Sequence, residues 1–415
     1  MTTDTLHRRR FLENGMRAGL TLAAAPALVT HLASCRPRQT ADVGGITTPS
    51  RLQRTIDRRF PRARLAHLPT PLEKLEVLTA GSPGSPSPGP QSPGLRAPGP
   101  RSPGPRWFIK RDDQTGLAFG GNKTRKLEFI LQDALDQGAD TILTSAGLQS
   151  NWARQTVAAA NMFGLKTVLV LSKPRPGPVD YDGNLFLDAL MGADIRFVEP
   201  DQSRQAVLDQ TAEELKAHGR RPYVVSVGGS RPGGSMAQPL GAIGYTMAFV
   251  ELYQQAQEQN TRIDSIVIAN GSGGTQAGLV VGARAAAPHV RIVGINVSGA
   301  REPARNNIAS IAQAAAHGLD LDMTITPEEI IVFDDYVGEG YGVMSPEIAR
   351  AITLLARKEA ILLDPVYTGK ALAGLLDLNE REYFREDENV VFIHTGGTPA
   401  LFPYRQEILE LAETA

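Results

Sequence analysis

The sequence predicts an α/β fold of open, mainly parallel, twisted sheets that are flanked by helices. Short β-rich runs alternate with stretches of helical spacing through most of the chain, which is the rhythm of a parallel sheet covered by helices. Two of these runs lead into turns of small residues that open a helix, at residues 147–151 and 271–275. With 415 residues the chain is long enough for one large or two medium domains.

The bulk composition argues against several classes of protein. The net charge of -1 gives no general attraction for nucleic acid. The seven histidines are scattered and Cys35 is the only cysteine, so neither a zinc-type spacing nor a disulfide framework is present. We therefore expect no metal and no nucleic-acid partner.

Residues 1–35 have the layout of an export signal. An Arg-Arg-x-Phe-Leu run at residues 8–12 precedes residues 18–33, which carry no Asp, Glu, Lys or Arg. This apolar stretch is short for a membrane span of about 20 residues. The run resembles a twin-arginine signal, and residues 32–35 resemble a lipobox, in which Cys35 would become the lipidated N-terminus. We expect an exported protein that is held to a membrane only by its lipid. The alternative is an apolar helix with a chance cysteine in a cytoplasmic protein.

Two segments are expected to lie outside the packed core. Residues 36–64 begin as a polar stretch and are predicted to be a tether. Residues 81–105 consist mostly of Gly, Pro and Ser, so they bury too little apolar surface to order themselves. We predict a disordered insertion, which a fold tolerates because the cost of closing a loop rises only logarithmically with its length. A wall-spanning or partner-binding segment is the alternative.

The elements follow in order along the chain. Residues 107–110 are expected to form a strand that leads into a helix at Lys123. A first series has strands at 141–144, 167–171, 195–198 and 223–227, with helices at 151–163, 184–191 and 203–217. A second series has strands at 265–269, 291–297, 330–333 and 390–393, with helices at 237–257, 275–287, 303–317, 345–359 and 370–376.

The most informative stretch is residues 120–128, Gly-Gly-Asn-Lys-Thr-Arg-Lys-Leu-Glu. The glycines permit a sharp turn, and Asn122 is a good N-cap for the helix that follows. Lys123 then lies in the first helical turn, where the helix dipole and the nearby Lys126 are expected to favour its neutral amine. A neutral amine can attack a carbonyl and form a Schiff base. The alternative is a solvated lysine pair at a helix start.

This stretch and residues 109–113 and 116–119 resemble the D-cysteine desulfhydrase and 1-aminocyclopropane-1-carboxylate (ACC) deaminase family. These are pyridoxal-phosphate (PLP) enzymes of the tryptophan-synthase-β fold type (fold type II). Four more motifs follow in the family's order, and the resemblance covers roughly residues 65–402. It implies a homodimer whose subunits hold PLP in a cleft between two α/β domains. The large domain would comprise residues 65–127 and 230–415, and the small one residues 128–229. Lys123 would carry the cofactor, and Lys126 would lie near its phosphate.

The turn at residues 147–151 is the candidate substrate site. It follows a strand and opens a helix, so its backbone N–H groups are available to bind a carboxylate. The resemblance implies that Gln149, Ser150 and Asn151 hold the substrate carboxylate, with Ser150 as a second acid or base and Asn151 bonded to the 3′-oxygen of PLP. Trp152 departs from the family's usual His or Gln, and it would make the pocket more apolar if it faced the substrate.

The turn at residues 271–275 is the candidate phosphate site. Small residues allow close approach, and successive N–H groups at a helix start suit a phosphate. It lacks the features of a Walker loop and of a dinucleotide fingerprint. In this order it matches the PLP-phosphate loop of the family, which implies binding by Gly271, Ser272, Gly273, Gly274 and Thr275.

Three further residues match active-site positions of the family. Tyr367 would stack on the pyridine ring and Tyr341 would reach the substrate side, although lone tyrosines are most often packing residues. Thr395 would hydrogen-bond the pyridine nitrogen. The deaminase branch has Glu and Leu where this chain has Thr368 and Thr395. A hydroxyl does not enforce protonation of the ring nitrogen, so the electron sink is weaker.

The resemblance therefore implies a PLP-dependent lyase that acts on a small amino acid. D-cysteine would be cleaved to pyruvate, ammonia and hydrogen sulfide, with Lys123, Ser150, Tyr341 and Tyr367 as the catalytic residues. The first alternative is an ACC deaminase. The second is a non-catalytic amino-acid-binding lipoprotein, which the presence of all four residues argues against.

Overall fold

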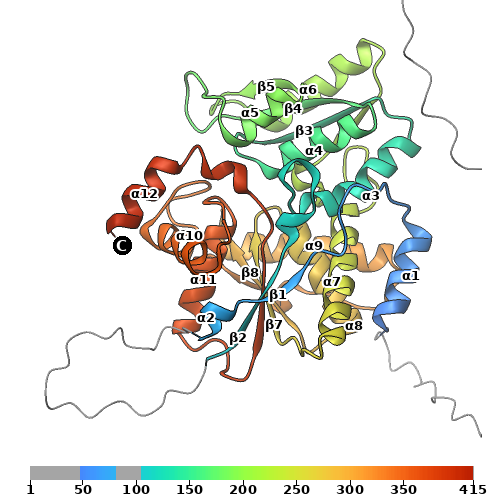
Figure 1. Ribbon diagram of the computed structural model, residues 1–415. Coiled ribbons are helices and arrows are strands. Elements are labelled where there is room, and N and C mark those ends of the chain that lie inside the picture. The colour runs from blue at the N-terminus through green and yellow to red at the C-terminus, as the bar shows by residue number, and fades with distance from the viewer. Residues whose placement is uncertain (1–46, 81–103, 415) are drawn as a thin grey trace, which may run out of the picture. The chain divides into compact units, whose positions relative to one another are not determined.

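The computed structural model describes residues 47–80 and 104–414, whose strands form two sheets flanked by helices (Figure 1). The strands of the larger sheet are β1 (Leu72–Lys74), β2 (Arg106–Lys110), β7 (Ser265–Asn270), β8 (Arg291–Asn296), β9 (Ile331–Phe333) and β10 (Asn389–Ile393). They lie in the order β1-β2-β10-β7-β8-β9. Only the β1–β2 pair is antiparallel.

The smaller sheet has four parallel strands. They are β3 (Thr141–Gly147), β4 (Lys166–Ser172), β5 (Asp194–Val198) and β6 (Pro222–Val225), in the order β5-β4-β3-β6. The helices that accompany this sheet are α3 (Lys123–Asp136), α4 (Asn151–Met162), α5 (Gly183–Leu190) and α6 (Arg204–Ala217). Together the two sheets confirm the predicted mainly parallel α/β fold.

Alternate residues of the strands supply separate cores on the two faces of the larger sheet. In β7, Ile266 and Ile268 pack on one side with α7 (Leu240–Glu258) and α8 (Gly274–Ala286). Val267 and Ala269 pack on the other side with α10 (Pro346–Glu359) and α11 (Thr368–Glu380). This is the two-residue period of a strand that is buried on both faces.

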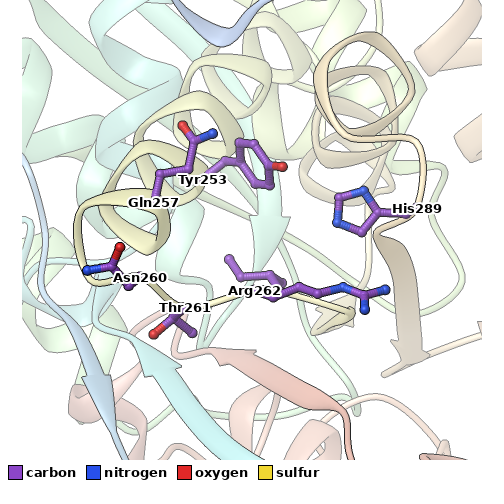
Figure 2. Close-up of a pocket in the computed structure, with 7 residues that line it drawn as sticks. Tyr253, Gln257, Asn260, Thr261, Arg262 and His289 are labelled. Carbon is purple, nitrogen blue, oxygen red and sulfur yellow. The ribbon is translucent and has the colours of Figure 1, made fainter.

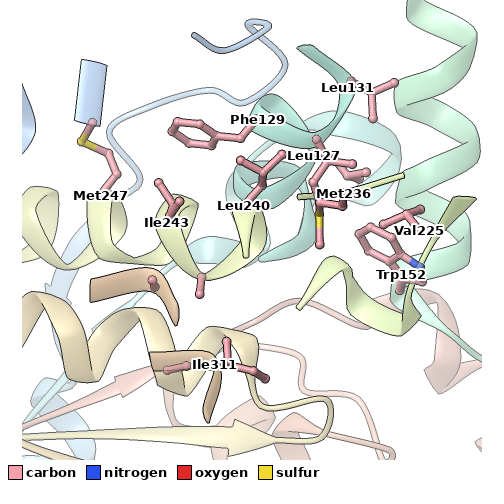
Figure 3. Close-up of a cluster of buried hydrophobic side chains, with 14 of the residues drawn as sticks. Leu127, Phe129, Leu131, Trp152, Val225, Met236, Leu240, Ile243, Met247 and Ile311 are labelled. Atoms are coloured by element: carbon pink, nitrogen blue, oxygen red, sulfur yellow. The ribbon is translucent and has the colours of Figure 1, made fainter. Parts of the chain in front are cut away.

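The smaller sheet is covered in the same way. Leu143 and Val170 pack against α6 on one face, and Ile142 and Leu169 belong to a larger cluster on the other. That cluster joins α3 and α4 to α7 and α9 (Arg301–Gly318) (Figure 3). Helix α3 is therefore packed between the helices of both sheets, which places Lys123 where they meet.

Part of the predicted tether belongs to the fold. Helix α1 (Pro49–Arg59) buries Leu52 and Ile56 against α7, and the Thr47 N–H donates to the Ala285 carbonyl (2.7 Å). The prediction of a tether was therefore wrong for residues 47–64. Residues 36–46 lie outside the described part of the chain. The structure also adds the short α2 (Glu76–Ala80) and α12 (Arg405–Thr414), which the sequence did not predict.

Several predictions fall on residues that the structure does not describe. The export signal and Cys35 lie within residues 1–46, and most of the predicted insertion lies within residues 81–103. Among the described helices, none combines the length and apolar character needed to cross a membrane. The predicted limits of the large and small domains stay a prediction.

Candidate active site

The turn before Lys123 has an unusual backbone. Four consecutive residues, 118–121, have positive φ angles of 42°, 68°, 64° and 128°. At residue 120 a side chain would place its Cβ 1.9 Å from the Asp113 carbonyl oxygen, so only glycine fits there. The chain therefore enters α3 through a turn that is narrowly defined, with Lys123 as the first helical residue.

The start of α3 is hydrogen-bonded to two other helices, α8 and α4. Asn122 Nδ2 donates to Thr275 Oγ1 at the start of α8 (3.1 Å), and the Thr124 N–H donates to Gln155 Oε1 in α4 (2.8 Å). The Asn122 side chain does not cap its own helix. Asn122 occupies the predicted N-cap position, but its amide reaches α8 instead of making a capping bond. The helix start that carries Lys123 is consequently tied to both α8 and α4.

Burial governs the charges of the two lysines. It lowers the pKa of Lys123 to about 8, and a hydrogen bond with Lys126 opposes this shift. The pKa of Lys126 falls further, because the side chain is fully buried and faces the positive charge of Lys123. The predicted direction for Lys123 agrees, but its cause is burial rather than Lys126. The lowered pKa of Lys123 makes its neutral amine accessible near neutral pH, where it can act as a nucleophile or base.

The turn at residues 271–275 is shaped to hold a phosphate. The N–H groups of Ser272, Gly273, Gly274 and Thr275 donate to no residue that the structure describes. Gly273 has a φ of 88°, and a Cβ at Gly274 would lie 2.5 Å from Ser230 Oγ. Free N–H groups at the start of α8, in a turn where positions 273 and 274 have no room for a side chain, fit the phosphate of PLP.

Lys126 reaches the same turn indirectly. Its Nζ donates to the Gly228 carbonyl oxygen (3.3 Å), which also accepts from Ser230 Oγ (3.2 Å). Ser230 Oγ is in turn 2.8 Å from Ser272 Oγ. Lys126 is therefore linked to the turn at residues 271–275 through Gly228 and Ser230, and its place near the cofactor phosphate stays a prediction. Ser230 was not predicted, because its contact with the turn depends on chain segments far apart in sequence.

The turn at residues 147–151 also offers free donors. The backbone N–H groups of Gln149, Ser150 and Asn151 donate to no described residue. Ser150 Oγ accepts weakly from the Ala153 N–H (3.4 Å), which leaves its hydroxyl hydrogen available. The Gln149 side chain is instead occupied by the start of α5, so a substrate carboxylate would meet its backbone.

Trp152 does not line this turn. Its side chain is 2% exposed and lies in the cluster of Figure 3, where Nε1 donates to Thr144 Oγ1 (2.9 Å). The ring packs so closely on Gly229 that a Cβ there would be 2.9 Å from it. The family departure at residue 152 is therefore accommodated in the core.

Tyr341 and Tyr367 connect the carboxyl ends of the two sheets. Their hydroxyls are 2.6 Å apart and their rings are edge-on. A Cβ at Gly147, where β3 ends, would lie 3.3 Å from the Tyr341 ring, and one at Gly271, just after β7, would lie 3.6 Å from the Tyr367 ring. The pair thus lies beside both candidate turns. Burial raises the pKa of Tyr367, so its hydroxyl remains a hydrogen-bond donor.

The two threonines of the predicted pyridine side have different roles. The Thr395 carbonyl accepts from the Asn122 N–H (3.0 Å), and its hydroxyl bonds to no described residue. The Thr368 hydroxyl donates to Asp364 Oδ1 (2.6 Å) and accepts from the Asp364 N–H (2.8 Å). Thr368 is therefore committed to the backbone turn, and only Thr395 offers a hydroxyl to a ligand.

Two ionisable residues beside the site were missed from the sequence. Arg154 and Asp188 are both fully buried, and burial lowers the pKa of Arg154 to about 10 and raises that of Asp188 to about 8. Neither Asp188 carboxyl oxygen has a hydrogen-bond partner among the described residues. The sequence did contain a signal for Arg154. It is the only charged residue among residues 151–160 of a predicted helix, and the others are small, apolar or uncharged.

Replacing Asp188 by asparagine should change how stability depends on pH. Between about pH 4 and pH 8 the unfolded chain ionises Asp188 while the native chain keeps it protonated, so wild-type stability falls as the pH rises. Asp188→Asn removes this term. Relative to wild type, the variant should gain up to about 1.4 kcal/mol of unfolding free energy per pH unit across that window.

Urea unfolding of both proteins at pH 5 and pH 8 measures the difference. Asp209→Asn, at an exposed carboxylate of α6, is the matched control. A stability difference between Asp188→Asn and wild type that is the same at both pH values would contradict the buried, protonated carboxyl.

A separate pocket lies at the other end of the larger sheet. It has a volume of about 520 Å³ and is lined by Tyr253, Gln257, Asn260, Thr261, Arg262, Ile263 and His289 (Figure 2). Arg262 and His289 precede β7 and β8, whereas the candidate site follows the strands. In open α/β sheets ligands bind beyond the carboxyl ends of the strands. The candidate site is therefore at the expected end, and this pocket is not.

The fold and the site together define an α/β enzyme that uses pyridoxal phosphate. The half-buried Lys123 begins a helix whose first turn is hydrogen-bonded to the two helices that follow the candidate phosphate and carboxylate turns. The chain belongs to the pyridoxal-phosphate-dependent enzyme family, whose model matches residues 88–396, within the group that includes the D-cysteine desulfhydrases. The predicted family and cofactor are thus confirmed.

The matches to similar proteins extend over almost the full length of those proteins. D-cysteine desulfhydrases of Klebsiella pneumoniae and Serratia proteamaculans are each 40% identical over 353 residues, 84% of this chain and 98% of theirs. A solved structure of an ACC deaminase homologue is 34% identical with a TM-score of 0.72, and the match covers 87% of this chain and 98% of that one.

Proposed function

We propose that this protein is a PLP-dependent carbon–sulfur lyase that converts D-cysteine to pyruvate, ammonia and hydrogen sulfide. The observation that carries the proposal is the pair of hydrogen bonds that ties the first turn of α3 to α8 and to α4. They hold Lys123 between donors suited to a phosphate and donors suited to an amino-acid carboxylate. The choice of D-cysteine as substrate is supported by the D-cysteine desulfhydrases that are 40% identical to this chain.

The residues of this chain would divide the work as follows. The N–H groups of residues 272–275 and, behind them, Lys126 hold the phosphate, and those of residues 149–151 orient the substrate carboxylate. Bound PLP would supply an electron sink for the pair that is left on Cα. Either Lys123 Nζ or Ser150 Oγ removes the α-proton. The C–S bond then breaks, hydrosulfide leaves, and the three-carbon enamine takes up water to give pyruvate and ammonia.

The other groups would orient the ring and the substrate. The Asn151 amide bonds the 3′-oxygen of the cofactor, Thr395 bonds its ring nitrogen and Tyr367 stacks on its ring. Tyr341, whose hydroxyl is hydrogen-bonded to that of Tyr367, would reach toward the substrate.

An assay of purified, PLP-loaded protein tests the proposal. Release of sulfide and pyruvate is measured for D-cysteine, L-cysteine and a panel of D- and L-amino acids. We expect both products from D-cysteine in equal amounts. Their absence in a protein that still binds the amino acid would favour the non-catalytic binding protein instead.

An ACC deaminase is the second candidate. It is favoured by the ACC deaminase homologue that shares 34% identity and a TM-score of 0.72 with this chain. Production of 2-oxobutanoate from ACC distinguishes the two activities.

We further propose that the chain is exported as a folded lipoprotein and assembles as a homodimer. PLP is held by groups that converge only in the folded chain, and the twin-arginine route carries folded proteins. Arg8 and Arg9 would therefore let the enzyme load its cofactor before export, and Cys35 would then anchor it by lipid. Cytoplasmic residence is the alternative.

Replacing Arg8 and Arg9 by lysine should trap unprocessed, active enzyme in the cytoplasm. Fractionation of cells and mass measurement of the mature N-terminus follow the outcome, and Cys35→Ser reports separately on the lipid. Unchanged export and lipidation of the double-lysine variant would mean that another route is in use.

A further inference from the structure

We propose that Arg154 is a positioning residue that fixes both the turn carrying Lys123 and the amide of Asn151. This inference deepens the proposed function and rests on it. Arg154 lies in α4 and would touch neither substrate nor the reacting atoms. It would act through the two segments that its guanidinium joins.

The contacts of Arg154 go to backbone and amide groups rather than to a carboxylate. Nη1 donates to the Ala118 carbonyl, and Nη2 donates to the Gly120 carbonyl (3.1 Å) and to Asn151 Oδ1 (3.3 Å). No described carboxylate comes within ion-pair distance. A fully buried arginine that uses its fork on two carbonyls of one turn acts as a clamp on that turn.

The turn needs such a clamp. Of its four residues with positive φ, Ala118 and Phe119 carry side chains, and non-glycine residues keep such a backbone only where the surroundings hold it. Phe119 is 60% exposed, so packing does not hold it. Arg154 bonds the carbonyls on either side of Phe119. These bonds fix the backbone that leads into α3 and so the position of Lys123.

The same guanidinium sets which way Asn151 faces. Asn151 Oδ1 accepts from Arg154 and from Asn184 Nδ2 (3.2 Å), so both donors fix the oxygen on the protein side. The Nδ2 group bonds to no described residue and is left to donate. A donor is what the 3′-oxygen of PLP requires, so Arg154 links the cofactor's lysine to the cofactor's amide partner.

Two acidic residues, Asp188 and Asp364, act on the charge of Arg154. When ionised, they raise the pKa of Arg154 against the lowering effect of burial. Asp188 has no hydrogen-bond partner and Arg154 Nε has none among the described residues. Asp188 stays protonated below about pH 8, so it forms no ion pair with Arg154 near neutral pH. The position of the guanidinium is set by the two carbonyls and by Asn151.

The test compares Arg154→Lys, Arg154→Gln and Arg291→Lys. Lysine keeps the charge but lacks the planar fork that reaches the two carbonyls and Asn151 from separate nitrogens, and glutamine removes the charge. Arg291 is the control because it bonds Ser265 and Glu388 at the opposite end of the strands. Hydrogen–deuterium exchange of residues 116–122 is measured in cofactor-free protein, and the PLP dissociation constant and the pH midpoint of the visible PLP band are measured in loaded protein.

Both Arg154 variants should speed exchange at residues 116–122, weaken PLP binding by about tenfold, and move the midpoint of the band. Arg291→Lys should do none of these, even where it lowers the melting temperature. Wild-type exchange in Arg154→Lys, or an unmoved band in both variants, would overturn the inference. If Arg154→Gln does not fold, Arg154→Lys decides. The exchange measurement needs no substrate, so it stands or fails independently of D-cysteine turnover.

Discussion

Lys123→Ala should abolish turnover and the visible absorption band of lysine-linked PLP. The lysine is the first residue of α3, and burial lowers its pKa to about 8, which makes a neutral amine accessible near neutral pH. Lys126 does not supply the same amine, because its Nζ donates to the Gly228 carbonyl. Losing a nucleophile and base of this kind costs about 10³-fold or more in rate.

Lys126→Ala is the matched variant, one helical turn further along. It should keep the visible band and turn over substrate, and it should lose PLP more readily on dialysis. Absorbance spectra and steady-state rates of both variants, made in parallel, check the assignment. A band that survives in Lys123→Ala would sink it.

D-cysteine should be a far better substrate than ACC. In the proposed arrangement Thr395 would offer a hydroxyl, and not a carboxylate, to the ring nitrogen, which would leave that nitrogen closer to neutral. The structure makes Thr395 the sole threonine of the two with a free hydroxyl, since Thr368 is bonded to Asp364. A weaker electron sink suffices when hydrosulfide departs from the β-carbon. It serves poorly for opening a cyclopropane, which has no leaving group.

The expected difference is several powers of ten, because a few kcal/mol of carbanion stabilisation has that effect on rate. Values of kcat/KM for both substrates, on one enzyme preparation, decide the matter. Production of 2-oxobutanoate from ACC that matches or exceeds pyruvate from D-cysteine would reverse the choice.

The regular part of the fold was readable because its strands are continuous apolar runs. Strand β7 was predicted at 265–269 and observed at Ser265–Asn270, since a strand buried on both faces carries apolar residues throughout. Helix α1 was not predicted because only Leu52 and Ile56 of its residues are buried, and several arginines lie between and around them. Strand β1 has three residues and one buried side chain, so no pattern exists for it to show.

The candidate site divides in the same way. Lys123, Ser150 and the turn at 271–275 were found because each lies in a contiguous motif. Arg154 and Ser230 were not, because each matters through a segment distant in sequence: Arg154 through the 118–121 turn, and Ser230 through Ser272. The engagement of Thr368 by Asp364 likewise depends on a folded backbone turn.

The two tryptophans give the protein a built-in optical reporter. Trp107 is buried in β2 and Trp152 in α4, so each sheet region holds one indole. Trp152 packs on Gly229, whose carbonyl abuts Gly241 beside the Lys126 side chain. Indole excitation passes to a nearby chromophore that absorbs its emission, and the efficiency falls steeply with distance. In Trp107→Phe, quenching of the remaining fluorescence would report arrival of PLP beside the phosphate turn, while Trp152→Phe would leave a signal from the six-stranded sheet alone.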